Sequence, residues 1–449
     1  MINDKPLAHI VTLGCQMNEH DSESIAGLLR DCGYDFTGEP ESADLIIYNT
    51  CCVRENPERK VYGQVGLLSR LKQEKPGLLV AVCGCMAQRP HEAQKIALRL
   101  PHVDLVLGTH NIHRLPVLLE QVRQTRERVV EVWHEEGDVV EGLPVIRESP
   151  IKAYVTVIYG CTNFCSYCIV PFVRGKERSR KPGAVVGEVE RLAADGVKEV
   201  MLLGQNVNSY GKDLEEKTDF AQLLRLLRQI PGIRRIRFTT SHPKDVSDEL
   251  IEIMAEPGKV CEHLHLPVQA GSDRVLWLMK RGYTRKGYEA LVSRIREAVA
   301  GLALTTDIIV GFPGETEKDF NETLELVESV GFDSAFTFIF APRPGTPAEH
   351  LPGQVAEEVK RDRIYRLIEV QNRVSNRINQ ALIGTTVPVL VEGTSDKHHG
   401  VLMGRTRTNK VVAFTGRPLP PGKEVEVRLT KAQTWTLFGE AVSSGAASN

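Results

Sequence analysis

No apolar run in the sequence approaches the roughly 18 residues that a membrane-spanning helix needs. The start of the chain holds an acidic residue and no apolar stretch, so we expect no secretory signal peptide. An excess of one charge is also missing, because 56 Lys and Arg stand against 58 Asp and Glu. Any contact with nucleic acid must therefore come from a local basic patch. We expect a cytoplasmic protein that does not associate with membranes.

The chain length predicts several domains, because 449 residues correspond to roughly two to four. The alternation of strands and helices along the chain predicts an α/β multidomain protein. In the first part, short apolar strands alternate with helical stretches, which predicts a small parallel sheet. The expected strands are 9–13, 44–48 and 78–82, with helices near 21–30 and 57–73. We expect this domain to cover residues 1–122 and a charged linker to cover 123–146.

The middle of the chain repeats the alternation of strands and helices more regularly. Six candidate strands cover 152–159, 198–204, 234–240, 259–267, 303–311 and 334–341. Helical patterns fill the intervals at 185–195, 220–230, 247–255, 286–300 and 317–330, and a long amphipathic helix follows at 354–382. A complete barrel of this kind has eight units, so we expect a partial parallel (β/α)6 barrel over residues 147–378.

After Gly384 the pattern changes to alternating polar and apolar residues with turns between the runs. This predicts a small all-β barrel, similar to an OB fold, over residues 379–443. Residues 380–443 hold eight Lys and Arg against five Asp and Glu, and small barrels often bind nucleic acid through such faces. Phe414, Trp435 and Phe438 are either stacking or core residues. We expect the tail, 444–449, to be disordered.

Three cysteines form the strongest local motif, Cys161-x3-Cys165-x2-Cys168, directly after the first strand of the middle domain. Clustered cysteines in a reducing compartment favour metal binding or catalysis over disulfides. A [4Fe–4S] cluster usually has four cysteine ligands, so three would leave one iron open for chemistry. The alternatives are a zinc knuckle or three packed thiols, but the motif contains no fourth ligand.

Three further cysteines, Cys15, Cys51 and Cys85, each follow a predicted parallel strand by about one to three residues. Parallel strands end at one edge of their sheet, so these thiols can meet there and form a second site with three ligands. The alternative is three unrelated buried cysteines, a common environment for this residue. The remaining cysteines are interpreted as structural, although two of them neighbour the proposed ligands and could compete with them: Cys32, Cys52, Cys83 and Cys261.

The cysteine motif on a six-unit barrel resembles the radical S-adenosylmethionine superfamily, and further motifs resemble its methylthiotransferases. These motifs are Gly14–Asn18, Asn49–Cys51, Gly84–Gln88, Gly204–Gly211, Thr240–Pro243, Leu266–Ser272, Asp307–Thr316 and Pro342–Thr346. They cover nearly the whole chain, and the C-terminal module resembles the TRAM domain. The departures are mild: Phe340-Ala341 stands where Tyr-Ser is usual, and Ala270 stands where Ser is usual.

The resemblance implies two [4Fe–4S] clusters, one held by Cys161, Cys165 and Cys168, the other by Cys15, Cys51 and Cys85. It implies S-adenosylmethionine as a cosubstrate, used twice per turnover: once to methylate a sulfur at the N-terminal cluster, and once to remove hydrogen from C2 of an adenine. The implied product is 2-methylthio-N6-(dimethylallyl)adenosine at position 37 of tRNAs. An aromatic C–H is beyond side-chain acid–base catalysis at neutral pH, so we nominate no catalytic side chain.

Polar and glycine residues at the ends of the middle strands are candidates for binding S-adenosylmethionine, because ligand sites of such barrels lie at that edge. They are Gly204, Gln205, Asn206, Ser241, Gln269, Asp307 and Gly311. A second basic stretch, 174–181, lies beside the Cys161 motif and is a candidate for phosphate contacts.

The resemblance also implies partners: the anticodon stem-loop of tRNA, an electron donor such as flavodoxin or ferredoxin, and a donor of sulfur or iron–sulfur units. We expect a monomer. Two alternative substrates are threonylcarbamoyl-adenosine in tRNA and an aspartate of a ribosomal protein; residues 205–208 favour the dimethylallyl substrate by resemblance. A further alternative is a non-catalytic iron–sulfur protein that binds RNA or carries electrons, which would not cleave S-adenosylmethionine.

Overall fold

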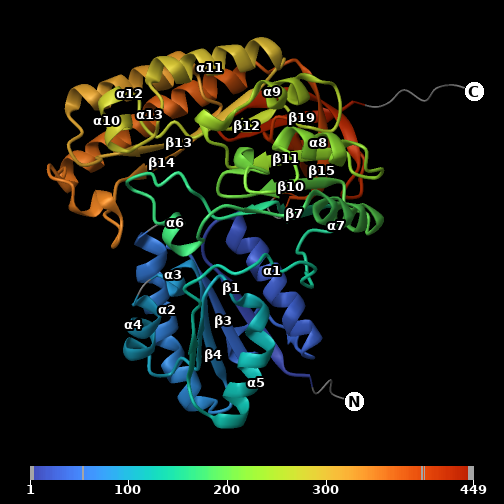
Figure 1. Ribbon diagram of the computed structural model, residues 1–449. Coiled ribbons are helices and arrows are strands. Elements are labelled where there is room, and N and C mark those ends of the chain that lie inside the picture. Colours follow the sequence, from blue (N-terminus) through green and yellow to red (C-terminus); the bar gives the residue numbers. More distant parts are fainter. Residues whose placement is uncertain (1–4, 53–54, 90, 396–397, 399, 443–449) are drawn as a thin grey trace, which may run out of the picture.

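The computed structural model describes residues 5–52, 55–89, 91–395, 398 and 400–442. Three units follow one another along the chain: an α/β unit, a larger α/β unit and a small β-barrel (Figure 1). The tail that we expected to be disordered lies outside the described residues. Among the described helices, none combines the length and the apolar character needed to cross a membrane.

The N-terminal unit is a parallel sheet of six strands in the order β2-β1-β3-β4-β5-β6. Its strands are β1 (Leu7–Thr12), β2 (Asp35–Phe36), β3 (Leu45–Thr50), β4 (Leu79–Gly84), β5 (Leu105–Leu107) and β6 (Val129–Glu131). Its helices are α1 (Gln16–Asp31), α2 (Glu55–Glu74), α3 (Cys85–Gln88), α4 (Glu92–Arg99) and α5 (Leu115–Thr125). Every residue of the central strand β3 is buried, which accounts for the apolar run at its start, Leu45–Tyr48.

Three strands of this sheet have no counterpart in the sequence-based prediction: β2, β5 and β6. They are two or three residues long, too short to show a periodic pattern. Strand β6 lies inside the stretch 123–146 that we expected to be a linker, and it pairs with β5. The N-terminal sheet therefore continues to Glu131, beyond the expected boundary at residue 122.

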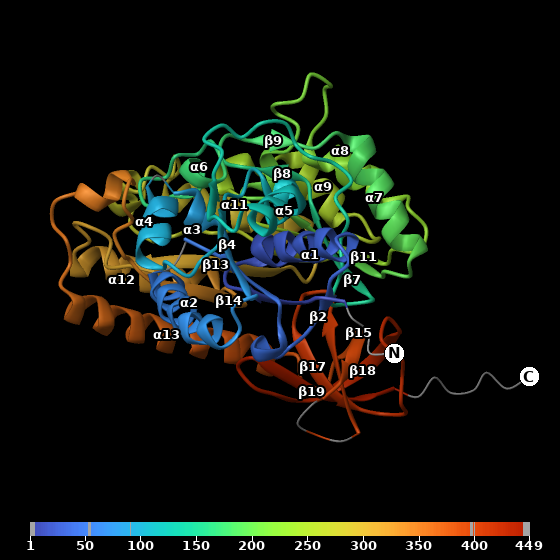
Figure 2. The ribbon, with the colours of Figure 1, turned by 90° about the horizontal axis from the view of Figure 1, so that it is seen from below.

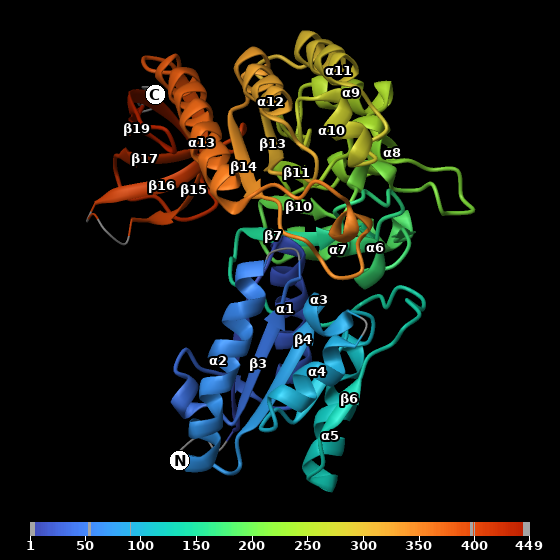
Figure 3. The ribbon, with the colours of Figure 1, turned by 90° about the vertical axis from the view of Figure 1, so that its left-hand side faces the viewer.

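The central unit has six parallel strands, as predicted. They are β7 (Lys152–Thr156), β10 (Glu199–Leu203), β11 (Arg235–Thr239), β12 (His263–His265), β13 (Ala303–Val310) and β14 (Ser334–Ile339). Two three-stranded sheets, β7-β10-β11 and β12-β13-β14, are joined by a parallel bridge between Ile236 and Val260. The result is an open, curved half-barrel. It packs on one extended apolar core and lies above the N-terminal sheet in Figure 3.

Helices cover the outer face of the half-barrel. They are α7 (Pro182–Ala194), α8 (Phe220–Arg228), α9 (Asp248–Ala255), α10 (Asp273–Leu278), α11 (Arg285–Ala298) and α12 (Glu317–Val330). The cysteine loop between β7 and α7 carries the short elements β8 (Ile158–Tyr159), α6 (Val170–Val173) and β9 (Arg178–Ser179). The long helix α13 (Glu357–Gln380) then runs along the edge of the half-barrel to the C-terminal module (Figure 2).

The C-terminal module is a closed five-stranded barrel with the strand order β15-β16-β17-β19-β18. Its strands are β15 (Thr386–Thr394), β16 (Val401–Thr406), β17 (Val411–Thr415), β18 (Glu424–Ala432) and β19 (Thr436–Ala441). Closure leaves no free sheet edge. The barrel has its own small apolar core, which includes Phe414.

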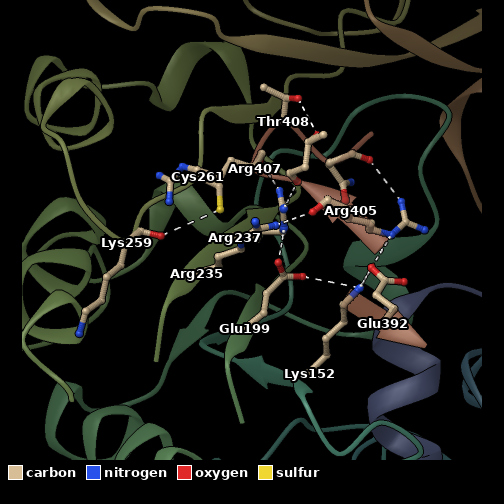
Figure 4. Close-up of polar contacts among 12 residues, drawn as sticks. Lys152, Glu199, Arg235, Arg237, Lys259, Cys261, Glu392, Arg405, Arg407 and Thr408 are labelled. Carbon is tan, nitrogen blue, oxygen red and sulfur yellow. Dashed lines mark hydrogen bonds and ion pairs between the residues drawn. The ribbon is translucent and has the colours of Figure 1, made fainter. Parts of the chain in front are cut away.

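The C-terminal barrel docks on the end of the half-barrel at which the parallel strands of the half-barrel begin (Figure 4). Arg235 is fully buried and donates to the carbonyl oxygens of Arg405, at 2.7 Å, and Pro388, and it forms an ion pair with Glu424. Arg237, two residues along β11, donates to the carbonyl oxygens of Thr406 and Arg407, both at 2.7 Å. The two buried guanidinium groups thereby join the two units.

Replacing Arg235 with Met is expected to lower the free energy of unfolding by about 2–3 kcal/mol. The cost stays below the 3–5 kcal/mol of a fully buried broken ion pair because Glu424 is partly exposed. Urea denaturation of the full chain measures the change. Arg417→Met, at an exposed position of the C-terminal barrel away from these contacts, is the matched control. Equal stability of both variants would show that the Arg235 contacts contribute nothing to docking.

Candidate functional site

Cys15, Cys51 and Cys85 lie at the carboxyl edge of the N-terminal sheet. Cys51 and Cys85 directly follow β3 and β4, whose last residues are in register, and Cys15 is the residue before α1. A Cβ atom at Gly14 would lie 2.8 Å from the Cβ of Cys51. Glycine at this position therefore allows the β1–α1 turn to approach the end of β3 closely.

The surroundings of this edge favour thiolates. Contact with the side chain of Cys51, together with the positive charge of Arg174, lowers the pKa of the Cys15 thiol to about 6. Contact with the thiol of Cys52 and the same arginine also lower the pKa of Cys85, although burial opposes this. Thiolates are the form in which cysteines bind metals.

The two other cysteines near this edge differ in their placement. Cys52 contacts Cys85 and shares its apolar cluster, so it directly neighbours the candidate site. Cys83 packs in the core cluster that contains Ala81 and Leu107, which does not include Cys85. Burial raises the pKa of the Cys83 thiol, so it remains protonated.

Cys161, Cys165 and Cys168 lie on the loop after β8, and this loop is held at several backbone positions. The amide of Cys161 donates to the carbonyl of Gly175 at 3.0 Å, and Ser166 donates to the carbonyls of Met279 and Leu278. Burial raises the pKa of Cys161 to about 11 and that of Cys168 to about 12. These thiols need a bound cation to become thiolates at neutral pH.

The donor set at both places fits an iron–sulfur cluster better than a single metal ion. In the described part of the chain, no three or more Cys, His, Asp or Glu side chains form a group that could hold one ion. A closed zinc site needs four ligands about 2.0–2.3 Å from one atom, whereas each of the two sets consists of three cysteines. A [4Fe–4S] cluster offers each thiolate a separate iron.

The two cysteine sites are close neighbours. Helix α6 begins two residues after Cys168, and Ile169 and Val173 at its ends share an apolar cluster with Cys85. The next residue, Arg174, donates its Nε–H to the sulfur of Cys85 at 3.1 Å. Arg174 stands six positions after Cys168, at most about 20 Å of extended chain and less where it is helical.

Two of the seven candidate residues for binding S-adenosylmethionine have buried polar atoms without partners in the described structure: Asn206 Oδ1 and Ser241 Oγ. Asn206 stands three positions after the last residue of β10, and Ser241 stands two positions after the last residue of β11. Nearly all buried polar groups in proteins are hydrogen-bonded, so orphaned atoms at a strand edge indicate a polar ligand. The side-chain nitrogen of Asn206, Nδ2, donates a hydrogen bond to the carboxylate of Asp245 at 2.8 Å.

Three of the seven have evident roles in packing. The side-chain oxygen of Gln205 accepts from the amide of Gly160, directly before Cys161, at 2.6 Å. A Cβ atom at Gly204 would lie 2.4 Å from Ile158, and one at Gly311 would lie 2.3 Å from Lys360. These glycines allow close packing beside the site.

The remaining two, Gln269 and Asp307, are joined through their backbones. The amide of Gln269 donates to the carbonyl of Asp307 at 2.9 Å, next to a parallel bridge between Gln269 and Ile308. The carboxylate of Asp307 lies 3.5 Å from Nε2 of His265. Neither contact establishes a ligand role, so all seven residues remain predictions.

The basic stretch 174–181 differs from our expectation of phosphate contacts. Arg174 is buried against Cys85 and Asp21, and Arg180 is buried in ion pairs with Glu141 and Glu188. Lys176 and Lys181 are exposed, and Arg178 is partly exposed with its guanidinium donating to the carbonyls of Glu136 and Gly137. Sequence alone shows the charge of an arginine but not the carboxylate that it meets in the fold.

The basic residues of the C-terminal barrel divide into two groups. Arg407 and Lys410 form ion pairs with Glu262 and Asp333 of the central unit. The backbone carbonyl of Arg405 accepts a hydrogen bond from Arg235. Exposed basic residues remain at Arg417, Lys423, Arg428 and Lys431, while position 397 lies outside the described residues. Of the three aromatic candidates, Phe414 is core, Phe438 is half-buried and Trp435 is 58% exposed.

Three family models match successive parts of the chain: uncharacterized protein family UPF0004 at residues 7–108, the radical SAM superfamily at 155–327 and the TRAM domain at 380–442. A tRNA-2-methylthio-N(6)-dimethylallyladenosine synthase from Acetivibrio thermocellus is 54% identical over 98% of this chain and 91% of its own length. A synthase of the same name from Moorella thermoacetica is 52% identical over 98% of this chain and 100% of its own. The chain belongs to this synthase family.

Solved structures support the fold of this member of the synthase family. The radical S-adenosylmethionine methyltransferase TsrM from Kitasatospora setae, solved with cobalamin and a [4Fe–4S] cluster, superposes with a TM-score of 0.58 at 15% identity, over 77% of each chain. The cobalamin-dependent radical enzyme OxsB superposes with a TM-score of 0.51 over 83% of this chain and 56% of its own. Family membership and these folds confirm the predicted radical SAM, methylthiotransferase and TRAM assignments.

One charged neighbour of the cysteine loop was not predicted from sequence. Arg281 lies in the turn between α10 and α11 and donates to the sulfur of Cys165 at 3.2 Å. It stands in the sequence Met279-Lys280-Arg281-Gly282, which gives no local signal, because the contact bridges more than a hundred residues. Only the three-dimensional fold brings this charge to the cysteine loop.

Proposed function

We propose that this chain adds a methylthio group to C2 of N6-(dimethylallyl)adenosine at position 37 of tRNAs, with S-adenosylmethionine as cosubstrate. The observation that carries the proposal is the full-length similarity to synthases of that name, at more than half identity. Two neighbouring sites of three cysteines, each with a charged arginine at one sulfur, support it. The names of the relatives favour this substrate over threonylcarbamoyl-adenosine or a ribosomal aspartate.

Cys161, Cys165 and Cys168 would hold the [4Fe–4S] cluster that binds S-adenosylmethionine. When bound, the cluster supplies the electron for cleavage of a sulfonium C–S bond, and this chemistry belongs to the cofactor. The protein holds the loop rigidly through the backbone contacts of Cys161 and Ser166. Asn206 and Ser241 would bond polar groups of S-adenosylmethionine, and burial of the site keeps water from it.

Cys15, Cys51 and Cys85 would hold the second [4Fe–4S] cluster, which would carry the sulfur that is inserted. The lowered pKa values of Cys15 and Cys85 prepare thiolates for it. Helix α6 and Arg174 fix this edge against the loop of the first cluster. Two S-adenosylmethionine molecules per turnover follow from the two roles, methyl donor and hydrogen abstraction.

The TRAM barrel and the names of the relatives support tRNA as the macromolecular substrate. Trp435 offers an exposed ring on which a base could stack, and Arg428 and Lys431 are exposed cations of the same barrel, features suited to an unpaired RNA segment. A base of the anticodon loop is accessible because it can leave its stack. An electron donor such as flavodoxin or ferredoxin, a sulfur donor, a monomeric state and a cytoplasmic location complete the proposal.

Nucleoside mass spectrometry of tRNA from a strain that lacks this protein tests the function. We expect 2-methylthio-N6-(dimethylallyl)adenosine to disappear and N6-(dimethylallyl)adenosine to accumulate in its place. The intact gene should restore the product, and the Cys51→Ala variant, as the matched control, should not. Unchanged levels of the methylthio nucleoside would refute the proposal. Loss of a methylthio group from threonylcarbamoyl-adenosine instead would support the alternative substrate.

A further inference from the structure

Arg174 is a buried charge shared between the two α/β units. The residue is 4% exposed, and it donates Nε–H to the sulfur of Cys85 at 3.1 Å and an Nη2–H to Asp21 at 2.6 Å. The arginine follows α6 of the central unit, whereas both partners belong to the N-terminal unit. The central unit therefore contributes a cation to the cysteine edge of the other.

Arg281 occupies the equivalent position at the second cysteine site. Its residue is 5% exposed, and its guanidinium donates to the carbonyl of Pro267 at 2.8 Å and the hydroxyl of Tyr283 at 2.9 Å. The remaining contacts are the hydroxyl of Tyr167 and the sulfur of Cys165, at 3.4 and 3.2 Å. Tyr167 and Cys165 both belong to the cysteine motif, so Arg281 contacts the loop at two of its residues.

The charge of Arg281 has no carboxylate partner among the ion pairs of the described residues. Arginine cannot lose its proton in a protein, and a buried cation without an anion costs several kcal/mol. A thiolate at Cys165, together with the cluster that it would bind, supplies the missing negative charge. The arginine is thus better explained with the cluster in place than without it.

We propose that Arg174 and Arg281 are positioning residues, one for each cluster, which donate a hydrogen bond to one ligating sulfur and thereby raise the reduction potential of that cluster. Hydrogen bonds to sulfur and nearby positive charge stabilise the reduced, more negative state. The proposal rests on the proposed function, because it takes Cys85 and Cys165 as ligands. A purely structural role would hold the chain in place without changing a potential.

Redox titration of the anaerobically reconstituted full chain, followed by electron paramagnetic resonance, tests this inference. We expect Arg281→Gln to lower the midpoint potential of the cluster whose spectrum changes with S-adenosylmethionine by about 60 mV or more, the equivalent of tenfold in a one-electron equilibrium. Arg174→Gln should lower the potential of the other cluster alone. Each variant is the matched control for the other, since both remove one buried arginine beside one cysteine.

Charge-retaining and compensated variants guard against misfolding. Arg174→Gln leaves Asp21 buried without its cation, so the double variant Arg174→Gln/Asp21→Asn removes the pair together. Arg174→Lys and Arg281→Lys should recover part of the potential, because the positive charge remains. Loss of a cluster in the Gln variant but retention in the Lys variant would also support the inference.

Three results would overturn it: unchanged potentials with full iron content, a shift confined to the wrong cluster, or cluster loss in the Gln and Lys variants alike, which would indicate a role in shape only. Failure of the proposed function has a different signature, since the unsubstituted chain itself would then bind fewer than two clusters or leave S-adenosylmethionine intact.

Discussion

Replacing Cys161, Cys165 or Cys168 with Ala is expected to abolish reductive cleavage of S-adenosylmethionine. The rate should fall by at least about a thousandfold, which corresponds to about 4 kcal/mol of lost transition-state stabilisation. The physical reason is that each variant removes one of three ligands and leaves a second iron without a thiolate. Chromatographic measurement of 5′-deoxyadenosine after addition of dithionite to the anaerobic protein gives the rate.

Cys32→Ala is the matched control, because this cysteine is exposed at the end of α1. It should cleave S-adenosylmethionine at the rate of the unsubstituted chain. Full activity in the three loop variants would contradict the assignment of the cluster. An inactive unsubstituted chain that nevertheless contains iron and sulfide would favour the non-catalytic iron–sulfur protein.

Replacing Cys15, Cys51 or Cys85 with Ala is expected to stop sulfur insertion while cleavage of S-adenosylmethionine continues without it. The two sites use separate cysteines on separate units, so loss of one need not empty the other. Iron should fall from about eight to about four atoms per chain, the content of one cubane. Iron analysis, 5′-deoxyadenosine measurement and nucleoside mass spectrometry on the same preparation distinguish the two activities.

Cys83→Ala tests whether the effect is specific, since this cysteine is buried one residue before the end of β4 but packs in another core cluster. It should keep both clusters and both activities. Cys52→Ala tests whether Cys52 is itself a ligand, because its thiol contacts that of Cys85. Retained iron in this variant would show that Cys52 is a neighbour of the cluster and not a ligand. Sulfur insertion by all three edge variants would refute the two-cluster arrangement.

The carboxyl-edge position of Cys51 and Cys85 was predictable from sequence, because the apolar runs of β3 and β4 mark where parallel strands end. The same rule placed Asn206 and Ser241 at the opening of the half-barrel. Both inferences need only local pattern and the general geometry of parallel sheets. The cysteine spacing at 161–168 likewise needs no information from distant parts of the chain.

Contacts between distant segments were not predictable in this way. Arg281 reaches Cys165 from a turn that carries no motif, and Arg407 pairs with Glu262 although its local sequence suggested an RNA-binding face. A charged residue in a sequence is equally consistent with a solvent-facing, RNA-facing or buried position. The shortest strands were missed for another reason: β6 has three residues and lies among charged ones.

The seating of the C-terminal barrel on Arg235 and Arg237 affects how truncated chains should be interpreted. Removing residues 380–442 would take away the carbonyl groups that accept hydrogen bonds from these two guanidinium groups. It would also expose to water the end of the half-barrel at which the strands begin. An inactive truncation would then report a damaged catalytic scaffold as much as weakened tRNA affinity. Single substitutions of exposed residues, such as Trp435→Ala or Lys431→Ala, leave the contacts of Arg235 and Arg237 intact. They therefore measure the contribution of the barrel to tRNA binding alone.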